Sequence, residues 1–305
     1  MRMSKTIKKD THKTKKNITK KKKGALYKIN LNNYIIAIPS YKRHDSISNK
    51  TLKVLEEQNI DTKRIYIFVA NKEEAKLYKN SLDKKYHPRI IVGKPHISNQ
   101  RNFISSYFSE GTCIAQFDDD VEEIYEMHHP MKKDKDKWSK LTYKDKIAKE
   151  FRKKQYLKPI KSLDKFIRHV FNKCVKEHIF LWGIYPIDNA YFMTFNEDDR
   201  LSFIVGPMFG IINRHNSNLK TSVKVKEDFE RTLNYYKMDG KVLRVNYITI
   251  KTKYYVNKGG IQAEGMDRME EARKASKILH EKFPNNTKLY IRKSTGMPEI
   301  RLLRK

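Results

Sequence analysis

The residues best suited to chemistry in this sequence are three consecutive aspartates, Asp118, Asp119 and Asp120, which follow the apolar run 113–115 after only Gln116 and Phe117. This position predicts a group of carboxylates at the end of a buried strand. Carboxylate oxygens are ligands that Mg²⁺ and Mn²⁺ prefer, and a metal that also binds phosphate usually takes only one or two of them. Asp118 and Asp120 would supply that number. A solvated acidic turn or a helix N-cap is the alternative interpretation.

Alternating strands and helices would position this motif. Buried strands are predicted over residues 33–40, 64–70, 89–93 and 112–117. Helices are predicted over residues 46–58, 72–82 and 98–111, with Ser46 or Ser48 capping the first and Ser98 capping the third. This order predicts an α/β fold, a Rossmann-like single domain with a mostly parallel central sheet. Ligands of such sheets bind at the carboxyl ends of the strands, where residues 39–41 and 118–120 fall.

The second half of the chain departs from this alternation. Residues 128–161 hold thirteen Lys or Arg against four acidic residues, and we interpret them as an insertion that is partly helical after Leu141. A strand pair is predicted over 201–214, and helices over 163–178, from 227 to a stop near Gly240, and over 266–283. The expected organisation is a disordered basic arm (1–30), one domain (31–285, insertion about 128–161) and a basic C-terminal tail (286–305) with a last strand in 288–293.

Net charge restricts the partners of this protein. The chain carries 66 Lys and Arg against 35 Asp and Glu, a net charge of +31, and residues 1–28 alone hold twelve basic residues and one acidic residue. With so few apolar side chains, this arm is expected to be disordered. Nucleic acid is the expected partner, through release of counterions. Nuclear addressing, a solubilising role and a Lys-rich coding bias are the alternatives for the arm.

Cysteine content and hydropathy bear on the compartment. Only Cys113 and Cys174 are present, so neither a disulfide framework nor a Cys-based zinc site is indicated. No apolar segment follows the N-terminal lysines as in a signal peptide, and the longest apolar stretch, residues 203–212, is too short to span a bilayer. We therefore expect no stable membrane insertion and an intracellular setting, the cytoplasm or nucleus of a host cell if the protein is viral.

Five short motifs, in order, resemble those of the GT-A-fold glycosyltransferases, which use nucleotide sugars. They are "AIPSYKR", "SNQRN", "IAQFDDD", "VGPMFGIINR" and "KEDFERTLNYYKMDGKVLRV", and they span about residues 33–250. More narrowly, "IPSYKR", "QRNFI" and "FDDDV" resemble the TET-associated DNA glycosyltransferases of viruses and phages. The resemblance implies a GT-A-like fold and a metal-dependent transfer of a sugar, glucose from UDP-glucose, to a hydroxymethylated pyrimidine in DNA. Mn²⁺ or Mg²⁺ would be the cofactor.

The resemblance also implies roles for individual residues. On the donor side it places Pro39, Ser40, Tyr41, Arg43, Arg101, Asp118 and Asp119. Among these, Asp118 would face the ribose and share the metal with Asp120. The two arginines would contact the diphosphate or the base, where positive charge stabilises the departing phosphate. The acceptor hydroxyl needs a base, for which Asp228 is our candidate and Glu227 the next, since a carboxylate heading a helix can accept a proton if its pKa is raised.

Several assignments keep an alternative at this point. Asp228 would otherwise be an N-cap or an acid that complements the helix dipole, and as a base it would favour inversion at the sugar. Residues 206–210 would form the wall under the sugar or a plain Gly-Pro turn. Gly259 and Gly260, with Gln262, would form a loop that closes over the diphosphate, because glycine lets backbone amides approach. No P-loop or dinucleotide-binding fingerprint is present.

The aromatic and histidine residues also have two interpretations. Trp182 and Tyr185 would stack on a base extruded from DNA or belong to the core. His128 and His129 would be metal ligands or lie in a surface loop. His280 is the last histidine after residue 215 and falls within a predicted helix, so completion of the metal shell by a histidine stays open.

Three further functions are alternatives to this interpretation. The same fold could transfer sugar to a glycan, lipid or protein, although no membrane anchor is predicted. A sugar nucleotidyltransferase is disfavoured, because its glycine-rich phosphate loop would follow the first strand, where this chain has "PSYKRHD". A catalytically inactive domain could instead serve as a nucleic-acid-binding module through the arm and residues 132–161, although Asp118, Asp120 and Asp228 are all in place.

Overall fold

The computed structural model describes residues 33–252, 267–293, 296 and 298–304. An eight-stranded sheet at its centre has the order β3-β2-β1-β4-β9-β7-β10-β8. Six of these strands run in one direction, while β9 is antiparallel to β4 and β7, and β8 is antiparallel to β10. The prediction of an α/β fold with a mostly parallel central sheet is therefore confirmed. The strands are β1 (Ile35–Pro39), β2 (Ile65–Val69), β3 (Ile90–Val92), β4 (Cys113–Phe117), β7 (Leu181–Ile184), β8 (Glu197–Asp198), β9 (Met208–Ile212) and β10 (Leu243–Val245).

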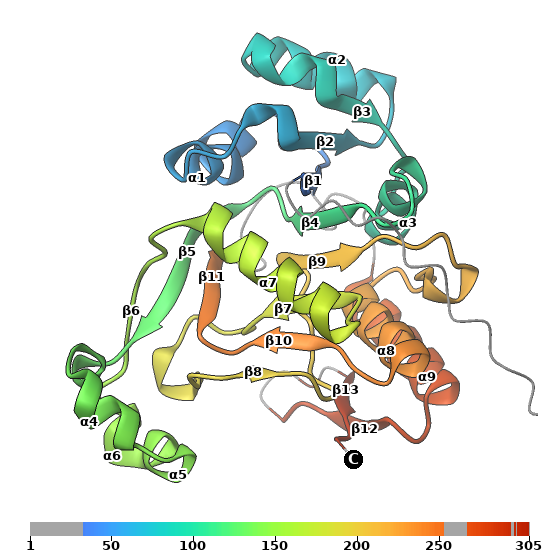
Figure 1. The fold of residues 1–305 in the computed structure, drawn as a ribbon. Helices are drawn as coiled ribbons and strands as arrows, with labels where there is room; N and C mark the ends of the chain where they lie inside the picture. Colours follow the sequence, from blue (N-terminus) through green and yellow to red (C-terminus); the bar gives the residue numbers. More distant parts are fainter. Residues whose placement is uncertain (1–32, 253–266, 294–295, 297, 305) are drawn as a thin grey trace, which may run out of the picture.

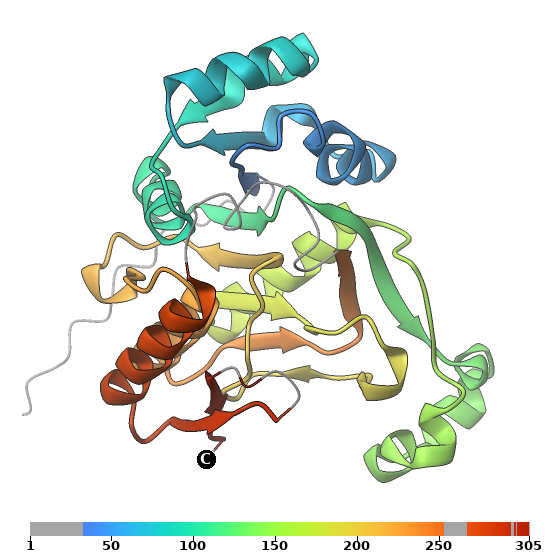
Figure 2. The ribbon, with the colours of Figure 1, turned by 180° about the vertical axis from the view of Figure 1, so that it is seen from behind.

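Helices cover both faces of this sheet (Figures 1 and 2). One face packs on α1 (Thr51–Glu57), α2 (Lys72–Ser81) and α7 (Leu163–Glu177), in a cluster that includes Ile36 and Ile38. The other face packs on α3 (Ile97–Tyr107) and α8 (Glu227–Asp239), in a cluster that includes Ala37. Successive residues of β1 thus enter opposite cores, as expected for a strand that is buried on both faces.

The C-terminal residues add an outer layer over α8. Helix α9 (Arg268–Lys282) buries Ala272, Ala275 and Leu279 with Leu233 of α8. The next segment, for which a basic tail with one strand is predicted, forms a two-stranded antiparallel hairpin of β12 (Thr287–Ile291) and β13 (Pro298–Leu302). Ile300 of this hairpin joins the same apolar cluster. The residues after α9 therefore contribute to the packed body.

The basic insertion lies between two strands of a second, three-stranded sheet with the order β11-β5-β6. These strands are β5 (Val121–His128), β6 (Tyr156–Pro159) and β11 (Ile248–Thr252). Between β5 and β6 the chain forms α4 (Lys135–Lys140), α5 (Tyr143–Ile147) and α6 (Lys149–Arg152). The insertion is predicted to be helical only after Leu141. Its first helix, α4, begins earlier, at Lys135, with Asp134 as the N-cap. The short 3-10 helices are η1 (Ile47–Asn49), η2 (Thr62–Arg64), η3 (Lys84–Arg89), η4 (Pro130–Lys133), η5 (Ala190–Phe192) and η6 (Ser217–Leu219).

Some local predictions are wrong at the helix starts. Neither Ser46 nor Ser48 caps α1, which begins at Thr51 after Lys50. Ser98 lies inside α3, and its hydroxyl donates to the Val223 carbonyl of a distant segment instead of capping the helix. The Ser98 hydroxyl, which the local pattern assigns to a helix cap, thus makes a hydrogen bond to a distant part of the chain instead. By contrast, α8 ends at Gly240, where φ is 75°, as predicted.

Two further observations concern residues 201–214 and the character of the helices. Of residues 201–214, predicted as a strand pair, only 208–212 form a strand, β9. Within the described part of the chain, no helix combines the length and the apolar character that crossing a membrane requires.

Candidate active site

A cavity of about 590 Å³ opens at the carboxyl ends of β1 and β4. Its size suits a nucleotide-sized ligand, since ligand pockets span roughly 300–1,000 Å³. Predicted site residues that line it are Pro39, Ser40, Tyr41, Arg43, Arg101, Asp118, Asp119, Asp120, Glu227 and Asp228. Segments separated by nearly two hundred residues therefore meet at one site, at the sheet edge where ligands of parallel sheets bind.

The turn that carries the three aspartates is fixed by its backbone. The Asp118 amide donates to the Pro207 carbonyl at 3.0 Å, which joins the end of β4 to the turn before β9. Thr51, the first residue of α1, donates its hydroxyl to the Asp118 carbonyl at 2.7 Å and accepts from the Val121 amide at 3.0 Å. The side chain of a single buried threonine thus closes both ends of the acidic turn.

Asp119 and Asp120 are held by the loop after β1. Ser40 Oγ donates to Asp119 Oδ2 at 2.5 Å, and Arg43 forms ion pairs with Asp119 and, at 3.0 Å, with Asp120. Burial raises the pKa of Asp119, and the Arg43 charge opposes that rise. Tyr78 OH completes the cluster through Ser40 Oγ at 2.5 Å. Asp119 therefore fixes the positions of Ser40 and Arg43, and its predicted contact with the donor stays a prediction.

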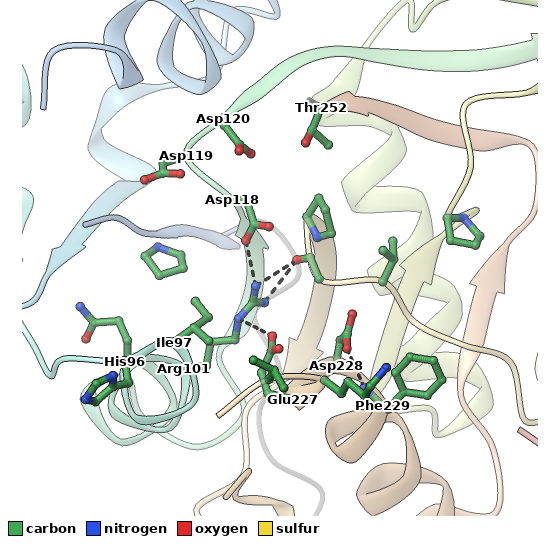
Figure 3. Close-up of a pocket in the computed structure, with 18 of the residues that line it drawn as sticks. His96, Ile97, Arg101, Asp118, Asp119, Asp120, Glu227, Asp228, Phe229 and Thr252 are labelled. Atoms are coloured by element: carbon green, nitrogen blue, oxygen red, sulfur yellow. Dashed lines mark hydrogen bonds and ion pairs between the residues drawn. The ribbon is translucent and has the colours of Figure 1, made fainter. Parts of the chain in front are cut away.

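Arg101 joins three walls of the cavity (Figure 3). Its Nη2 donates to Asp118 Oδ1 at 2.8 Å, both terminal nitrogens lie 3.3 Å from the Gly206 carbonyl, and its Nε lies 3.2 Å from Glu227 Oε1. Burial raises the pKa of Asp118 to about 7, while the Arg101 charge opposes the rise. The guanidinium thus links the head of α3, the end of β4 and the head of α8.

Two neighbouring carboxylates at the head of α8 differ in their surroundings. Glu227 is buried, and its Oε1 lies 3.2 Å from Arg101 and 3.6 Å from Arg231. Asp228 lies at the cavity surface, where one oxygen accepts from the Phe229 amide at 2.9 Å (Figure 3). Burial, and then the adjacent Glu227 charge, raise the pKa of Asp228 to about 6. Asp228 is therefore the better placed of the two to exchange a proton near neutral pH.

Arg231 does not line the cavity, but it pairs with Glu227, which does, and the sequence analysis missed it. Its guanidinium lies 3.6 Å from the centre of the Phe209 ring, and that of Arg101 lies 4.8 Å from the same ring. Burial, and then the Arg101 charge, lower the pKa of Arg231 to about 10. Two buried guanidinium groups thus share one aromatic ring, and Glu227 pairs with both of them. The spacing of four residues from Glu227 to Arg231 was the available signal.

Other residues line the cavity although the sequence analysis gave them no role. They are Lys94, His96, Ile97, Gln100, Lys226, Phe229, Thr252, Tyr290, Arg292, Glu299 and Ile300. His96 and Lys226 precede α3 and α8 in the left-handed region, with φ of 65° and 62°, and neither caps its helix with a side chain. In the first turn of α8 the Phe229 amide donates to Asp228. The first residues of both helices, Ile97 and Glu227, line the cavity, and helix N-termini favour anions. Glu299 connects the hairpin to this edge, through Lys226 at 2.7 Å and Arg292 at 2.9 Å.

The donor set can be tested against the divalent cation that the sequence predicts. Asp118 and Asp120 both offer carboxylate oxygens to the cavity, and oxygen is the donor type that Mg²⁺ and Mn²⁺ prefer. In the described part of the chain, however, no three His, Cys, Asp or Glu residues are grouped so that they could hold a metal by themselves. The residues fit a metal that is held by two carboxylates and completed by phosphate oxygens and water. His280 lies elsewhere, bonded to Thr287 at 3.0 Å.

Several predicted residues lie away from the cavity. Trp182 is completely buried against Phe166 and Phe171, with ring centres 5.9 and 5.5 Å away, so of its two interpretations the core position is confirmed and stacking on an extruded base is excluded. Gly210 lies under the same indole, where an added Cβ would be 2.2 Å from Nε1, and so forms core rather than the wall under a sugar. Gly206 does line the cavity.

The two histidines after β5 are packed against aromatic rings. His129 is buried and stacks on Phe151 at 3.7 Å, so it belongs to no exposed loop, and His128 stacks on Tyr156 at 5.9 Å. Tyr185 is partly buried under Arg244, which lies 5.4 Å from its ring centre. Gly259, Gly260 and Gln262 lie outside the described residues.

Comparisons with known proteins give limited information. No protein-family model and no curated protein matches the sequence. Solved structures similar in fold include two of S. aureus TarS 1-349, one of them in complex with UDP-GlcNAc. The first has a TM-score of 0.41 at 10% identity and covers 70% of this chain and 58% of its own. For the UDP-GlcNAc complex the values are 0.48, 10%, 83% and 67%. Similarity at this level does not establish a shared activity.

Proposed function

We propose that this protein is a metal-dependent glycosyltransferase that moves a sugar, glucose in the first instance, from a nucleotide-diphosphate sugar to a hydroxymethylated pyrimidine in DNA. One observation carries the proposal. The strand-end loop 39–43, the aspartates 118–120, Arg101 and the Glu227–Asp228 pair all line a single cavity, in the arrangement that the resemblance to GT-A glycosyltransferases implies. The DNA acceptor is supported by the narrower motif resemblance and by the net charge of +31.

The charges of the cavity suit the transfer. Breaking the bond between the anomeric carbon and the diphosphate oxygen leaves positive charge on the sugar and negative charge on the diphosphate. Arg43 and Arg101 both line the cavity and could stabilise the departing diphosphate. A divalent cation held by Asp118 and Asp120 would add Lewis-acid stabilisation of the same phosphate oxygens.

Asp228 completes the reaction. As the acceptor oxygen bonds to the anomeric carbon, its hydroxyl proton passes to the Asp228 carboxylate, and the nucleoside diphosphate leaves. A pKa of about 6 keeps this carboxylate ionised at neutral pH while making it more basic than an ordinary aspartate. Glu227 serves a different purpose, because its pairing with Arg101 and Arg231 keeps both guanidinium groups in place.

A transfer assay tests the proposal. The protein is incubated with Mn²⁺ or Mg²⁺, one of several labelled nucleotide sugars including UDP-glucose and UDP-GlcNAc, and duplex DNA that contains 5-hydroxymethylcytosine or 5-hydroxymethyluracil. Unmodified duplex and the Asp228→Asn variant are the controls. Nucleoside mass spectrometry should show a hexose on the modified base alone. Donor hydrolysis without labelled DNA would leave a glycosyltransferase with another acceptor, and the absence of both reactions would contradict the proposal.

A further inference from the structure

Positive charge is concentrated on the insertion. Residues 132–161 hold thirteen Lys or Arg and four acidic residues, a net charge of +9 over 30 residues. Residues 1–28 have a net charge of +11, so the other 247 residues of the chain share a net charge of only +11. The insertion is therefore a local concentration of charge and differs from the average surface of this basic protein. Such a concentration is the electrostatic signature of a polyanion-binding surface.

The acidic residues of the insertion neutralise few of its cations. Three of the four are used within their own helices, where Asp134 caps α4, Asp145 closes the cap of α5 and Glu150 pairs with Lys153 at 2.8 Å. Several exposed lysines of the insertion have no carboxylate within ion-pair distance in the described part of the chain, and four of them are Lys140, Lys144, Lys149 and Lys154. Their charges are directed to solvent and are available to an external anion.

The insertion projects from the body yet is anchored to it. Strands β5 and β6 carry the helices α4, α5 and α6 clear of the central sheet in both views (Figures 1 and 2). At their base a small aromatic cluster forms, in which Trp138 meets Phe195 edge to face at 4.8 Å and the ring of Phe151 lies 6.1 Å from that of Trp138. This packing makes the helices a fixed platform, because contacts between partly buried rings set their orientation to the body.

The platform is connected to the cavity through two segments. Strand β5 begins at Val121, the residue after the cavity aspartate Asp120. On the other side, Pro186 and Ile187 line the cavity, and the chain then runs through η5, which contacts α6 and β6. Large apolar side chains are exposed along this route, with Ile187 and Phe192 both 51% exposed and Tyr143 of α5 61% exposed. Exposed rings beside lysines suit nucleotides, because bases stack on aromatic faces while phosphates meet the cations.

We propose that the α4–α6 platform is a docking surface for DNA, which it binds by the phosphate backbone and holds so that a neighbouring nucleotide can reach the cavity. The docking stands on the charge, exposure and placement of the insertion. The delivery of a nucleotide to the cavity rests on the proposed function. A duplex fits better than an acidic protein, because phosphates are regularly spaced and every released counterion adds to affinity.

Binding to a fluorescein-labelled 30-base-pair duplex, measured by anisotropy from 50 to 300 mM NaCl with the full chain, tests the docking. In the platform variant, Lys140, Lys144, Lys149 and Lys154 are replaced together by Gln. The matched control replaces four exposed lysines of the α2 region by Gln: Lys72, Lys76, Lys79 and Lys84. Both variants lose the same net charge, so the comparison separates location from total charge.

The platform variant should bind with a Kd about 10- to 100-fold higher at 0.1 M salt, and the slope of log K against log salt should fall by up to about 3.6. The control should change Kd less than about threefold. Equal losses in the two variants, or no loss in the platform variant, would overturn the docking. The docking would also be overturned if binding to vesicles of phosphatidylserine and phosphatidylcholine depended on these lysines while binding to DNA did not. Melting temperatures of both variants should match the parent.

The delivery is tested separately. Hydrolysis of the nucleotide sugar in the absence of DNA should be unchanged in the platform variant, because none of its four lysines lines the cavity. Transfer to modified duplex should fall in parallel with affinity. Unchanged transfer would overturn the delivery, whereas lysine-dependent DNA binding by a protein that transfers no sugar would uphold the docking and contradict the proposed function.

Discussion

Arg101 Nη2 lies 2.8 Å from Asp118 Oδ1, so that the second turn of α3 is bonded to the residue that follows β4. The same guanidinium lies 3.2 Å from Glu227 Oε1, and its side chain is only 6% exposed. Both carboxylates therefore depend on one buried cation. Breaking a buried pair by removing one partner is costly, because the other charge stays buried without compensation.

The substitution Arg101→Met should consequently lower the free energy of unfolding by about 3–5 kcal/mol. The double variant Arg101→Met, Glu227→Gln should recover part of that loss, since one uncompensated carboxylate is removed. Neither variant should bind a nucleoside diphosphate as the parent does. Urea unfolding followed by circular dichroism measures the first effect and calorimetry the second. A single variant as stable as the parent would show that Arg101 is not required for the charge balance.

The pH dependence of turnover tests Asp228. Burial and the Glu227 charge raise the pKa of Asp228 to about 6, and the carboxylate must be ionised to accept a proton. The rate kcat/KM should therefore rise about tenfold per pH unit up to about pH 6 and then level off. The variant Asp228→Asn should lose about 10²- to 10⁴-fold in turnover, the usual contribution of a general base. A parent profile without this acidic limb would exclude Asp228 as the base.

The same substitution should stabilise the fold. A carboxyl whose folded-state pKa exceeds its unfolded value of about 3.8 binds its proton more tightly when folded, so stability falls as pH rises from about 4 to 6. Above pH 6 the ionised Asp228 imposes its full cost. Asn removes that cost, and we expect Asp228→Asn to be more stable by about 1–2 kcal/mol at pH 8 and by little at pH 4. Thermal unfolding of Asp228→Asn at both pH values shows whether its loss of turnover comes from the missing carboxylate or from a destabilised fold.

The central sheet and the acidic motif could be predicted because local patterns determine them. Strands buried on both faces have mostly apolar sequences, and 113–117 is apolar except for Gln116, so the aspartates that follow were expected at a sheet edge. Position 240 could also be predicted as the end of α8, because glycine adopts the left-handed conformation without strain.

The remaining parts of the site depend on contacts that local patterns do not encode. Ser98 has the residue type of an N-cap, but a carbonyl 125 positions away accepts its hydroxyl. Tyr290 and Glu299 reach the cavity because the hairpin packs on α9, and α9 packs on α8. The sequence around Trp182 does not show whether its ring stacks on a ligand or packs in the core. Its burial follows from the helix, α7, that covers β7.

Gly210 on β9 should be intolerant of any side chain. A Cβ at this position would be 2.2 Å from Trp182 Nε1 and 2.3 Å from the adjacent ring carbon, and the indole is completely buried between neighbours. Gly210→Ala should therefore lower the free energy of unfolding by about 1–3 kcal/mol, as overpacked cores do. The exposed turn residue Gly240 is not a suitable control, since its φ of 75° penalises alanine by itself. Gly206→Ala, whose Cβ would meet nothing closer than 3.4 Å, should be tolerated by the fold in the same denaturant titration.

Asp120 separates metal binding from folding. Its carboxylate pairs with Arg43 at 3.0 Å, but Arg43 also pairs with Asp119, so Asp120→Ala leaves that guanidinium with a partner. We expect the variant to keep its melting temperature within a few degrees and to lose the metal-dependent part of nucleoside diphosphate binding, because one of two candidate oxygen ligands is gone. Calorimetric titration of UDP with and without Mn²⁺ measures that difference. The neighbouring Glu122→Ala, outside the cavity, serves as the control and should bind like the parent. If metal-dependent binding survives in Asp120→Ala, the cation is bound elsewhere. The aspartates would then have only the role of positioning Arg43 and Arg101.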